Sequence, residues 1–189
     1  MGAVWRSFSL PSTSPDRIHA ITDRISRGDC TLLAETVRRL DQESDAPILF
    51  LIDSPGGTGP AAEMLTAVIS FCRSPTIGLV GCRAASSAFE ILQACDLRLA
   101  FAASFVLTHF SYQAPGGFAL SSASDIDGLT AYKEAQLRLY TSMWTQTVES
   151  LCRRTGIAPE LARQILSRDR WIPAKEACAL GFLDGIVGG

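Results

Sequence analysis

The chain lacks clustered cysteines and histidines, and it lacks long apolar runs. It holds two histidines and six cysteines among 189 residues, and no two cysteines stand in a C-x-x-C pair. This spacing disfavours a zinc site and favours free thiols in a reducing compartment, so we expect no metal and a cytoplasmic location. No apolar run reaches the roughly 18 residues that a membrane-spanning helix needs, so no membrane partner is expected.

Neither sign of charge is in large excess. The 17 Lys and Arg residues stand against 19 Asp and Glu, which leaves a formal net charge of −2. This balance gives no general electrostatic reason to bind nucleic acid. The first residues lack the apolar core of a secretory signal. With 47% apolar residues the chain is expected to fold, and its length suits a single domain over 1–189.

Short apolar runs alternate with helical patterns in the middle of the chain. Pro47–Ile52 is too short for a helix and is typical of a strand buried on both faces, as in a parallel sheet. Beyond it we expect a helix at 60–72, a strand at 76–81, a helix at 85–94, and strands at 97–101 and 105–108. This alternation predicts an α/β fold with functional loops at the carboxyl ends of its strands.

The segments before and after this region have their own patterns. Residues 1–17, which are rich in serine and proline, indicate a short strand or an irregular start. Ile18, Ile21 and Ile25 open a helically spaced series, interrupted at Gly28, that predicts two helices or one broken helix over 18–40. At the other end we expect a helix at 159–167, a strand at 171–172, a helix at 173–180 and a strand at 182–187.

A long helix is expected from Ser124 to Arg154. Ser124 with Asp127 suits its N-terminal cap, and Gly156 suits its stop. At about 1.5 Å per residue it would span about 45 Å, longer than a compact domain of this size. We therefore expect it to project and to bury its apolar face against another subunit. The alternative is a long helix folded back on its own core.

The turn Ser54-Pro55-Gly56-Gly57 follows a buried strand and precedes a helix. Glycines at such a place let backbone N–H groups point towards an anion, and the helix dipole reinforces the site. The alternative is a simple tight turn.

Ser86 lies at the next junction of a strand and a helix, among small residues from Gly81 to Ala88. A serine there exposes its hydroxyl beside free helix N–H groups, and the amide of Ser87 is placed to stabilise an oxyanion on an attacked acyl group. The alternative is that Ser86 merely caps the helix.

His109 ends the strand expected at 105–108. A serine hydroxyl needs a base to become a nucleophile at neutral pH, and the pKa of histidine suits that task. The base in turn needs a carboxylate to fix its tautomer, and spacing alone does not choose one. The other histidine, His19, is expected to have a surface or packing role.

Four segments in this order resemble the Clp protease proteolytic subunit family. They are Ser54–Gly57, then Ala84–Ser86, then the strand that ends in His109, and lastly Arg168–Ala177 with Leu180–Asp184 after it. The resemblance covers roughly residues 46–187. Residues 1–45 diverge from the family, and about 118–156 match its handle region.

The resemblance implies a ClpP-type serine endopeptidase on a crotonase-like α/β fold, with repeated strand–strand–helix units and a projecting handle helix. Carried over by position, Ser86 is the nucleophile, His109 the base and Asp169 the orienting carboxylate, while the amides of Gly57 and Ser87 form the oxyanion hole. The family further implies a homo-oligomer of stacked rings around a chamber, polypeptide substrates, an ATP-dependent unfoldase partner and no cofactor.

Three other interpretations stay open at this point. Glu90 and its neighbours also resemble the helix that carries a catalytic glutamate in acyl-CoA hydratases and isomerases. A serine–lysine peptidase would need Lys133 or Lys175 as its base, and neither stands where a base is expected. A ring subunit with a misaligned, silent triad is the third.

Overall fold

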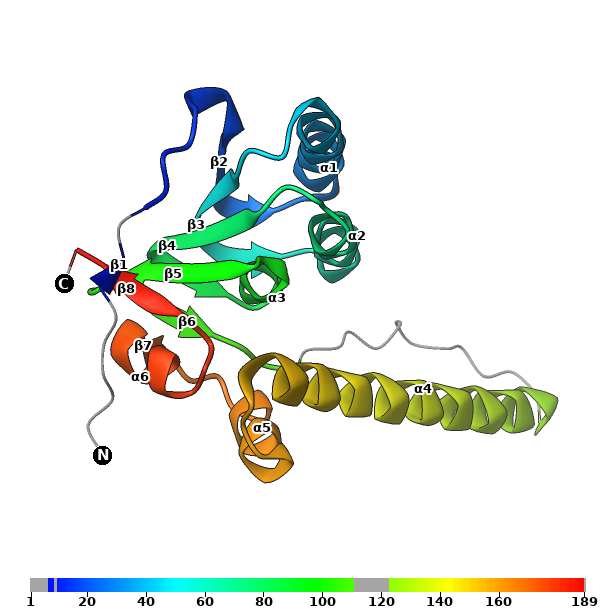
Figure 1. Ribbon diagram of the computed structural model, residues 1–189. Coiled ribbons are helices and arrows are strands. Elements are labelled where there is room, and N and C mark those ends of the chain that lie inside the picture. The colour runs from blue at the N-terminus through cyan, green and yellow to red at the C-terminus, as the bar shows by residue number, and fades with distance from the viewer. Residues whose placement is uncertain (1–6, 9, 111–122, 189) are drawn as a thin grey trace.

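The computed structural model of the protein describes residues 7, 8, 10–110 and 123–188 (Figure 1). For residue 7 and residues 123–129 it describes the backbone alone. The predicted cap of the long helix at Ser124 and Asp127 therefore falls outside the described side chains. The start of the predicted handle region, from 118 to 122, lies outside the described residues.

Within these described residues, eight strands form one sheet. They are β1 (Ser7–Phe8), β2 (Ile18–Ile25), β3 (Ile48–Gly57), β4 (Thr76–Ala85), β5 (Leu97–Phe101), β6 (Phe105–Leu107), β7 (Ile172–Pro173) and β8 (Gly185–Val187). Their main order is β1-β8-β5-β4-β3-β2, with every neighbouring pair parallel. The fold is thus the α/β class that the alternating pattern predicts, and the strands at both ends of the chain meet at one edge.

The two halves of strand β4 pair with different strands on the same side. Its first half, from Ile77 to Val80, pairs with β5, and its end, from Arg83 to Ala85, pairs in parallel with β6. Strand β7 then adds to β6 in the antiparallel direction. This division brings the ends of β4 and β6 side by side, which places the segments after them next to each other.

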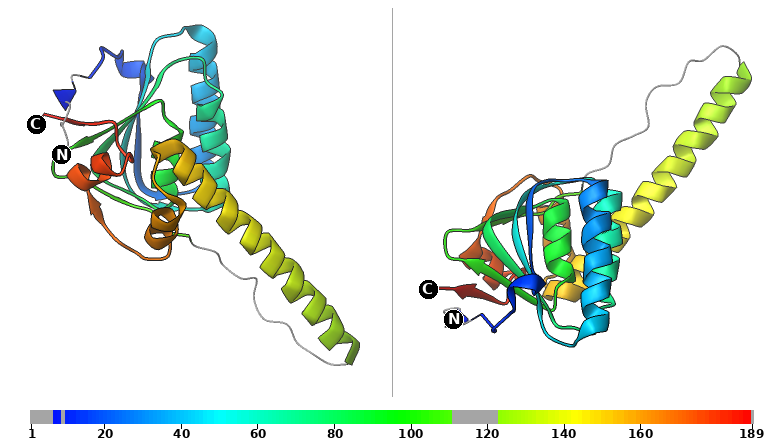
Figure 2. Two further views of the ribbon diagram at one scale, coloured as in Figure 1. Left: turned by 60° about the horizontal axis from the view of Figure 1, so that its bottom comes forward. Right: turned by 90° about the horizontal axis from the view of Figure 1, so that it is seen from above.

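The helices are η1 (Pro15–Arg17), α1 (Arg27–Glu43), α2 (Gly59–Ser70), α3 (Ser87–Ala94), α4 (Ala123–Thr155), α5 (Pro159–Leu166) and α6 (Ala174–Ala179). Helices α1, α2 and α3 lie in a row along one face of the sheet (Figures 1 and 2). The predicted boundaries of α2, α3, α5 and α6 agree with these to within a few residues.

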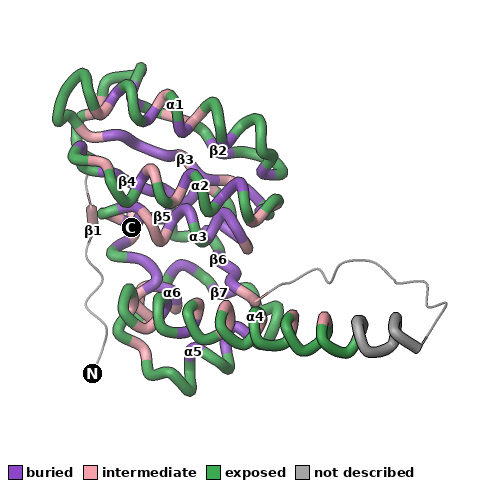
Figure 3. Tube along the Cα trace, turned by 90° about the vertical axis from the view of Figure 1, so that its right-hand side faces the viewer, coloured by how far each residue is buried: buried purple, intermediate pink, exposed green. Residues whose placement is uncertain are grey.

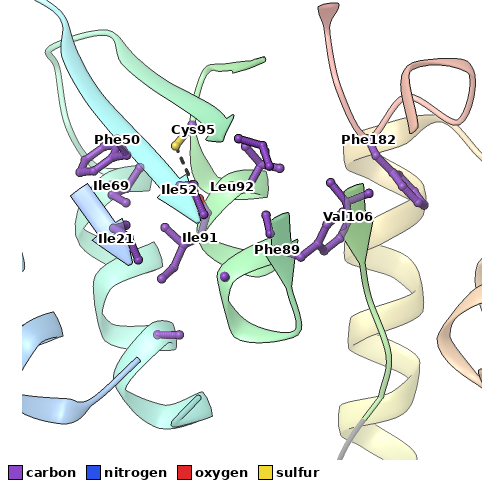
Figure 4. Close-up of a cluster of buried hydrophobic side chains, with 14 of the residues drawn as sticks. Ile21, Phe50, Ile52, Ile69, Phe89, Ile91, Leu92, Cys95, Val106 and Phe182 are labelled. Atoms are coloured by element: carbon purple, nitrogen blue, oxygen red, sulfur yellow. Dashed lines mark hydrogen bonds between the residues drawn. The ribbon is translucent and has the colours of Figure 1, made fainter. Parts of the chain in front are cut away.

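The main core lies between the sheet and this row of helices. Phe50 and Ile52 of β3 and the α3 residues Phe89, Ile91 and Leu92 are almost completely buried there (Figure 4). The continuous apolar run of β3 is explained by this position, because a strand inside a parallel sheet has no solvent-facing side. A smaller buried cluster contains Leu49, Ile77, Leu79 and Leu99.

The helix predicted over Ile18–Ile25 is wrong, because this segment is strand β2. Ile21 and Ile25 are buried while Ile18 is 42% exposed. Ile21 and Ile25 are four positions apart, which places them on one face of either a helix or a strand. Their burial therefore does not distinguish the two structures. Asp23, with a φ of 58°, marks an irregularity at which the pairing with β3 shifts register. The β-branched residues of the segment favour the strand.

Helix α4 is the long helix that the sequence predicts, and it projects from the sheet (Figures 1 and 2). It ends where expected, because Gly156 has a φ of 78° and its N–H donates to the Cys152 carbonyl over 2.8 Å. Its base is anchored by Arg154, whose Nε donates to the Gln93 carbonyl of α3 over 2.9 Å. Across the described ranges, no helix combines the length and apolarity needed to cross a membrane.

Two buried arginines, which the sequence patterns did not single out, hold distant segments together. Arg98 of β5 binds both carboxylate oxygens of Asp184, just before β8, at 2.6 and 3.0 Å. Burial opposes ionisation of Asp184, but the Arg98 hydrogen bonds and charge outweigh it and lower the pKa of that carboxyl. Arg17 donates to the carbonyls of Leu40 and Ala46, at the end of α1 and beyond it.

Candidate active site

Ser86 occupies a strained backbone position between β4 and α3. Its φ of 53° and ψ of −125° are uncommon for any residue other than glycine, and its N–H is fixed to the Leu107 carbonyl at 2.9 Å. Ser86 stands at the N-cap of α3, yet its side chain makes no capping hydrogen bond. The hydroxyl is therefore not used as a cap, which was the structural alternative for this serine.

His109 stands two residues beyond β6, the strand that pairs with the end of β4. Because Ala85 is registered with Leu107, Ser86 and His109 leave neighbouring strand ends in the same direction. The two side chains meet, with His109 Nε2 3.0 Å from Ser86 Oγ. Phe110, the next residue, fixes this segment to the end of α5, because its N–H donates to the Leu166 carbonyl at 2.9 Å.

Asp169 reaches the other ring nitrogen from the segment between α5 and β7. Its Oδ1 lies 2.6 Å from His109 Nδ1, although the two residues are 60 positions apart. With the proton on Nδ1, the ring donates to Asp169 and leaves Nε2 free to accept from Ser86. The Asp169 side chain is 76% exposed, against 25% for His109. Its neighbour Arg170 is tied to Glu176 of α6 at 2.8 Å, which steadies this exposed segment.

The segment Ser54–Gly57, predicted as a turn after the strand, is instead the last part of strand β3, where it pairs with β2 and β4 and runs beside Ser86. A Cβ atom on Gly56 would lie 2.6 Å from the Ala85 carbonyl oxygen and 2.8 Å from Ser86 Cβ. One on Gly57 would lie 2.2 Å from the Ile25 carbonyl oxygen. Glycine is thus required at both positions by close backbone approach, and this end of β3 lies against Ser86.

The two predicted oxyanion-hole amides have different surroundings. The Ser87 N–H is the first of α3, where a helix offers no intrahelical acceptor. The Gly57 N–H instead donates to the Ser87 hydroxyl, with Gly57 N 2.8 Å from Ser87 Oγ. The sequence prediction for Ser87 concerned its backbone alone, and the hydroxyl directly after the candidate nucleophile is the sequence signal for this additional contact.

Glu90, the residue of the acyl-CoA hydratase interpretation, lies on α3 and is not part of the Ser86–His109–Asp169 arrangement. It lines a cleft of about 440 Å³ together with Glu63 of α2 and Arg154 of α4. Glu90 is exposed as a whole residue, but its carboxyl is partly removed from solvent within the cleft. This desolvation, with a smaller contribution from the charge of Glu63, raises the pKa of Glu90 to about 7. The charge of His109 acts in the opposite direction.

The remaining candidates lie elsewhere in the fold. Lys133 is on the projecting part of α4 and Lys175 is in α6, whereas the base within hydrogen-bonding distance of Ser86 is His109. His19 is in β2, where its ring packs 6.4 Å from that of Phe50. In the part of the chain that the structure describes, no cluster of three His, Cys, Asp or Glu residues is arranged to hold a metal ion.

Comparisons with known proteins agree with this fold. A family model described as Clp protease matches residues 12–189. The ATP-dependent Clp protease proteolytic subunit 1 of Chlamydia muridarum is 29% identical over 143 residues, which cover 75% of this chain and 70% of that protein. Its counterpart from Protochlamydia amoebophila is 29% identical over 192 residues, which cover 95% of this chain and 88% of that protein.

A solved structure gives the same picture at the level of the fold. A mutant ClpP1 from Listeria monocytogenes superposes with a TM-score of 0.75 at 19% identity, covering 92% of each chain. This likeness establishes the ClpP-like fold, in which α4 fits the position of the handle.

Proposed function

This chain belongs to the Clp protease family, and from that premise we propose that it is a ClpP-type serine endopeptidase whose catalytic residues are Ser86, His109 and Asp169. One observation carries this assignment: a continuous hydrogen-bonded chain runs from Ser86 Oγ through the His109 ring to Asp169 Oδ1, over 3.0 and 2.6 Å. The three residues come from separate parts of the sequence, so local structure alone does not explain their meeting.

The geometry supports acyl transfer in two steps. Ser86 Oγ attacks the carbonyl carbon of a peptide bond while His109 Nε2 takes the hydroxyl proton. His109 then gives this proton to the departing amine as the C–N bond breaks, which leaves the acyl group on Ser86. A water molecule, deprotonated by His109, hydrolyses that ester. Asp169 holds the ring in the required tautomer and stabilises its charged form.

The negative charge on the carbonyl oxygen requires donors. We assign this role to the backbone N–H groups of Ser87 and Gly57, which flank Ser86 from α3 and β3. The close approach at Gly56 supports this assignment, because it brings the β3 backbone against Ser86.

Assembly is the second part of the proposal. Leu137 and Leu139 of α4 are 66% and 47% exposed on a helix that projects from the protomer. Such side chains are expected to be covered in a homo-oligomer, and closed symmetric rings supply the covering surfaces. By likeness to relatives named as ATP-dependent proteolytic subunits, we propose stacked rings around a chamber, unfolded polypeptides as substrates and an ATP-dependent unfoldase as partner.

The proposed compartment is the cytoplasm. All six cysteines are free, including Cys82 on the surface. Free exposed thiols persist where the environment is reducing, which supports this location.

A fluorophosphonate probe tests the chemical part of the proposal. We expect the assembled protein to be labelled at Ser86, identified by peptide mapping, and to hydrolyse a fluorogenic peptide. Ser70→Ala, which removes an exposed serine at the end of α2, serves as the matched control and should be labelled like the parent. Absence of label in every assembly state would contradict the peptidase assignment and favour a silent ring subunit.

A further inference from the structure

The Ser87 side chain stands where it affects the proposed oxyanion hole. Gly57 N donates to Ser87 Oγ at 2.8 Å, and Ser87 is only 3% exposed. This contact links the first residue of α3 to the end of β3, across 30 positions of sequence. The N–H that it uses is one of the two that we assign to the oxyanion.

The backbone around Gly57 is fixed on its other side. Gly57 pairs with Ile25 of β2, and the following N–H, of Thr58, donates to the Ile25 carbonyl at 3.0 Å. The preceding N–H, of Gly56, donates to Ser54 Oγ at 3.1 Å. The β3 backbone therefore has little room to turn its Gly57 N–H towards a second acceptor.

The Ser87 hydroxyl is the mobile member of this contact. It depends on a single side-chain torsion with three staggered positions, and a change of this torsion moves the oxygen without moving the Ser87 backbone N–H. Since one N–H makes one well-aligned hydrogen bond, the hydroxyl and a substrate oxyanion cannot both take the Gly57 N–H at full strength.

We propose that the Ser87 hydroxyl is a built-in competitor for the oxyanion hole, which holds the Gly57 N–H in the resting enzyme until substrate displaces it. This inference rests on the proposed function. Ser87 then acts in two opposite ways: its backbone N–H stabilises the oxyanion, while its side chain slows acylation of Ser86. The side chain has a positioning role, because its hydroxyl acts through Gly57, whereas the backbone N–H contacts the oxyanion itself.

The rate of Ser86 labelling by a fluorophosphonate measures this competition, since the phosphoryl oxygen of the probe takes the place of the oxyanion. We expect Ser87→Ala to label about threefold to tenfold faster than the parent, the factor associated with one intramolecular hydrogen bond. Ser87→Thr and Ser87→Val form a matched pair of equal shape. Valine, which has no acceptor, should label faster than threonine by a similar factor.

Hydrogen exchange provides a second measurement that does not depend on activity. With its acceptor gone, the Gly57 N–H should exchange faster in Ser87→Ala than in the parent and in Ser70→Ala. Faster labelling together with faster Gly57 exchange supports the competitor.

Two results would overturn the inference while leaving the peptidase assignment intact. Unchanged labelling of Ser86 in Ser87→Ala would show that the contact does not compete, and slower labelling would show that the hydroxyl itself donates to the oxyanion. If neither the parent nor any Ser87 variant is labelled at Ser86, the proposed function fails first, and this inference fails with it.

Discussion

The sheet end that carries Ser86 and the outer part of α4 differ in how far their side chains are buried and contacted within one protomer. At the sheet end, Ala84 and Val106 are completely buried and Ser86 meets His109 within one protomer. Among the α4 side chains that the structure describes, from Thr130 onwards, the buried ones are Val148 and Leu151 at the base, and most of the others are exposed (Figure 3). The proposed catalytic residues therefore meet within one chain, whereas we propose that another copy covers the projecting helix.

The largest effect is expected at the sheet end from Ser86→Ala. Loss of the nucleophile should lower peptide hydrolysis by at least about 10³-fold, because triad residues act as a unit. Removal of one hydroxyl that caps nothing should leave folding and native mass unchanged. Peptide hydrolysis and light scattering on the same sample check this, and hydrolysis at the parent rate would remove Ser86 from the mechanism.

His109→Ala should be nearly as severe. Without its base, Ser86 keeps its proton at neutral pH, so we expect a fall of about 10³-fold or more in kcat. Circular dichroism should show an unchanged fold, because His109 follows β6 rather than forming part of it. A variant that retains more than a tenth of the activity would point to a different base.

The opposite result is expected from the outer part of α4. Leu137→Glu with Leu139→Glu adds charge to two exposed apolar positions, which should change protomer stability by only about 0.5 kcal/mol each. If the helix joins two rings, native mass should fall to about half or less of the parent value. Ser142→Glu, on the exposed surface of the same helix, is the control. Unchanged mass in the double variant, measured by light scattering, would contradict the handle assignment.

The smallest effect is expected at Glu90, in the cleft lined by α2, α3 and the inner part of α4. Its pKa is raised to about 7 in the folded protein, chiefly by desolvation, from an ordinary value of 4.5. The folded state therefore binds more protons between these two values, and stability falls as pH rises from 4.5 to about 7.

Glu90→Gln should remove that fall. Its Tm is expected to exceed that of the parent at pH 8 and to match it closely at pH 4, with Glu35→Gln on the exposed face of α1 as the control. Thermal unfolding across this pH range is the measurement. A Tm difference that is the same at both pH values would show that Glu90 does not titrate in the cleft.

From Ile48 onwards sequence patterns predicted the order of strands and helices, because buried apolar runs and helical repeats mark them. The strand ends were less accurate, because β3 continues to Gly57 and β4 to Ala85, and β8 begins only at Gly185. The patterns failed at β2, where Ile21 and Ile25 satisfy a helical and a strand repeat equally. Propensity alone does not decide such a segment, since pairing with β3 provides the partner that stabilises it.

The site was accessible to sequence reasoning only in part. Ser86 and His109 follow strands that patterns can find, whereas Asp169 was identified by resemblance, because one carboxylate among many has no distinguishing local pattern. The Gly57–Ser87 contact and the buried Arg98–Asp184 pair join residues 30 and 86 positions apart. Such contacts depend on the packing of whole elements, which a single sequence does not display.

Trapping of the acyl-enzyme tests the central claim most directly. The assembled protein is mixed with a peptide ester, quenched in acid during turnover, digested and mapped by mass spectrometry, with Ser86→Ala treated in parallel. We expect one added acyl group, on Ser86, in the parent and none in the variant. An acyl group on another nucleophile such as the exposed Cys82, or steady turnover by Ser86→Ala, would contradict it.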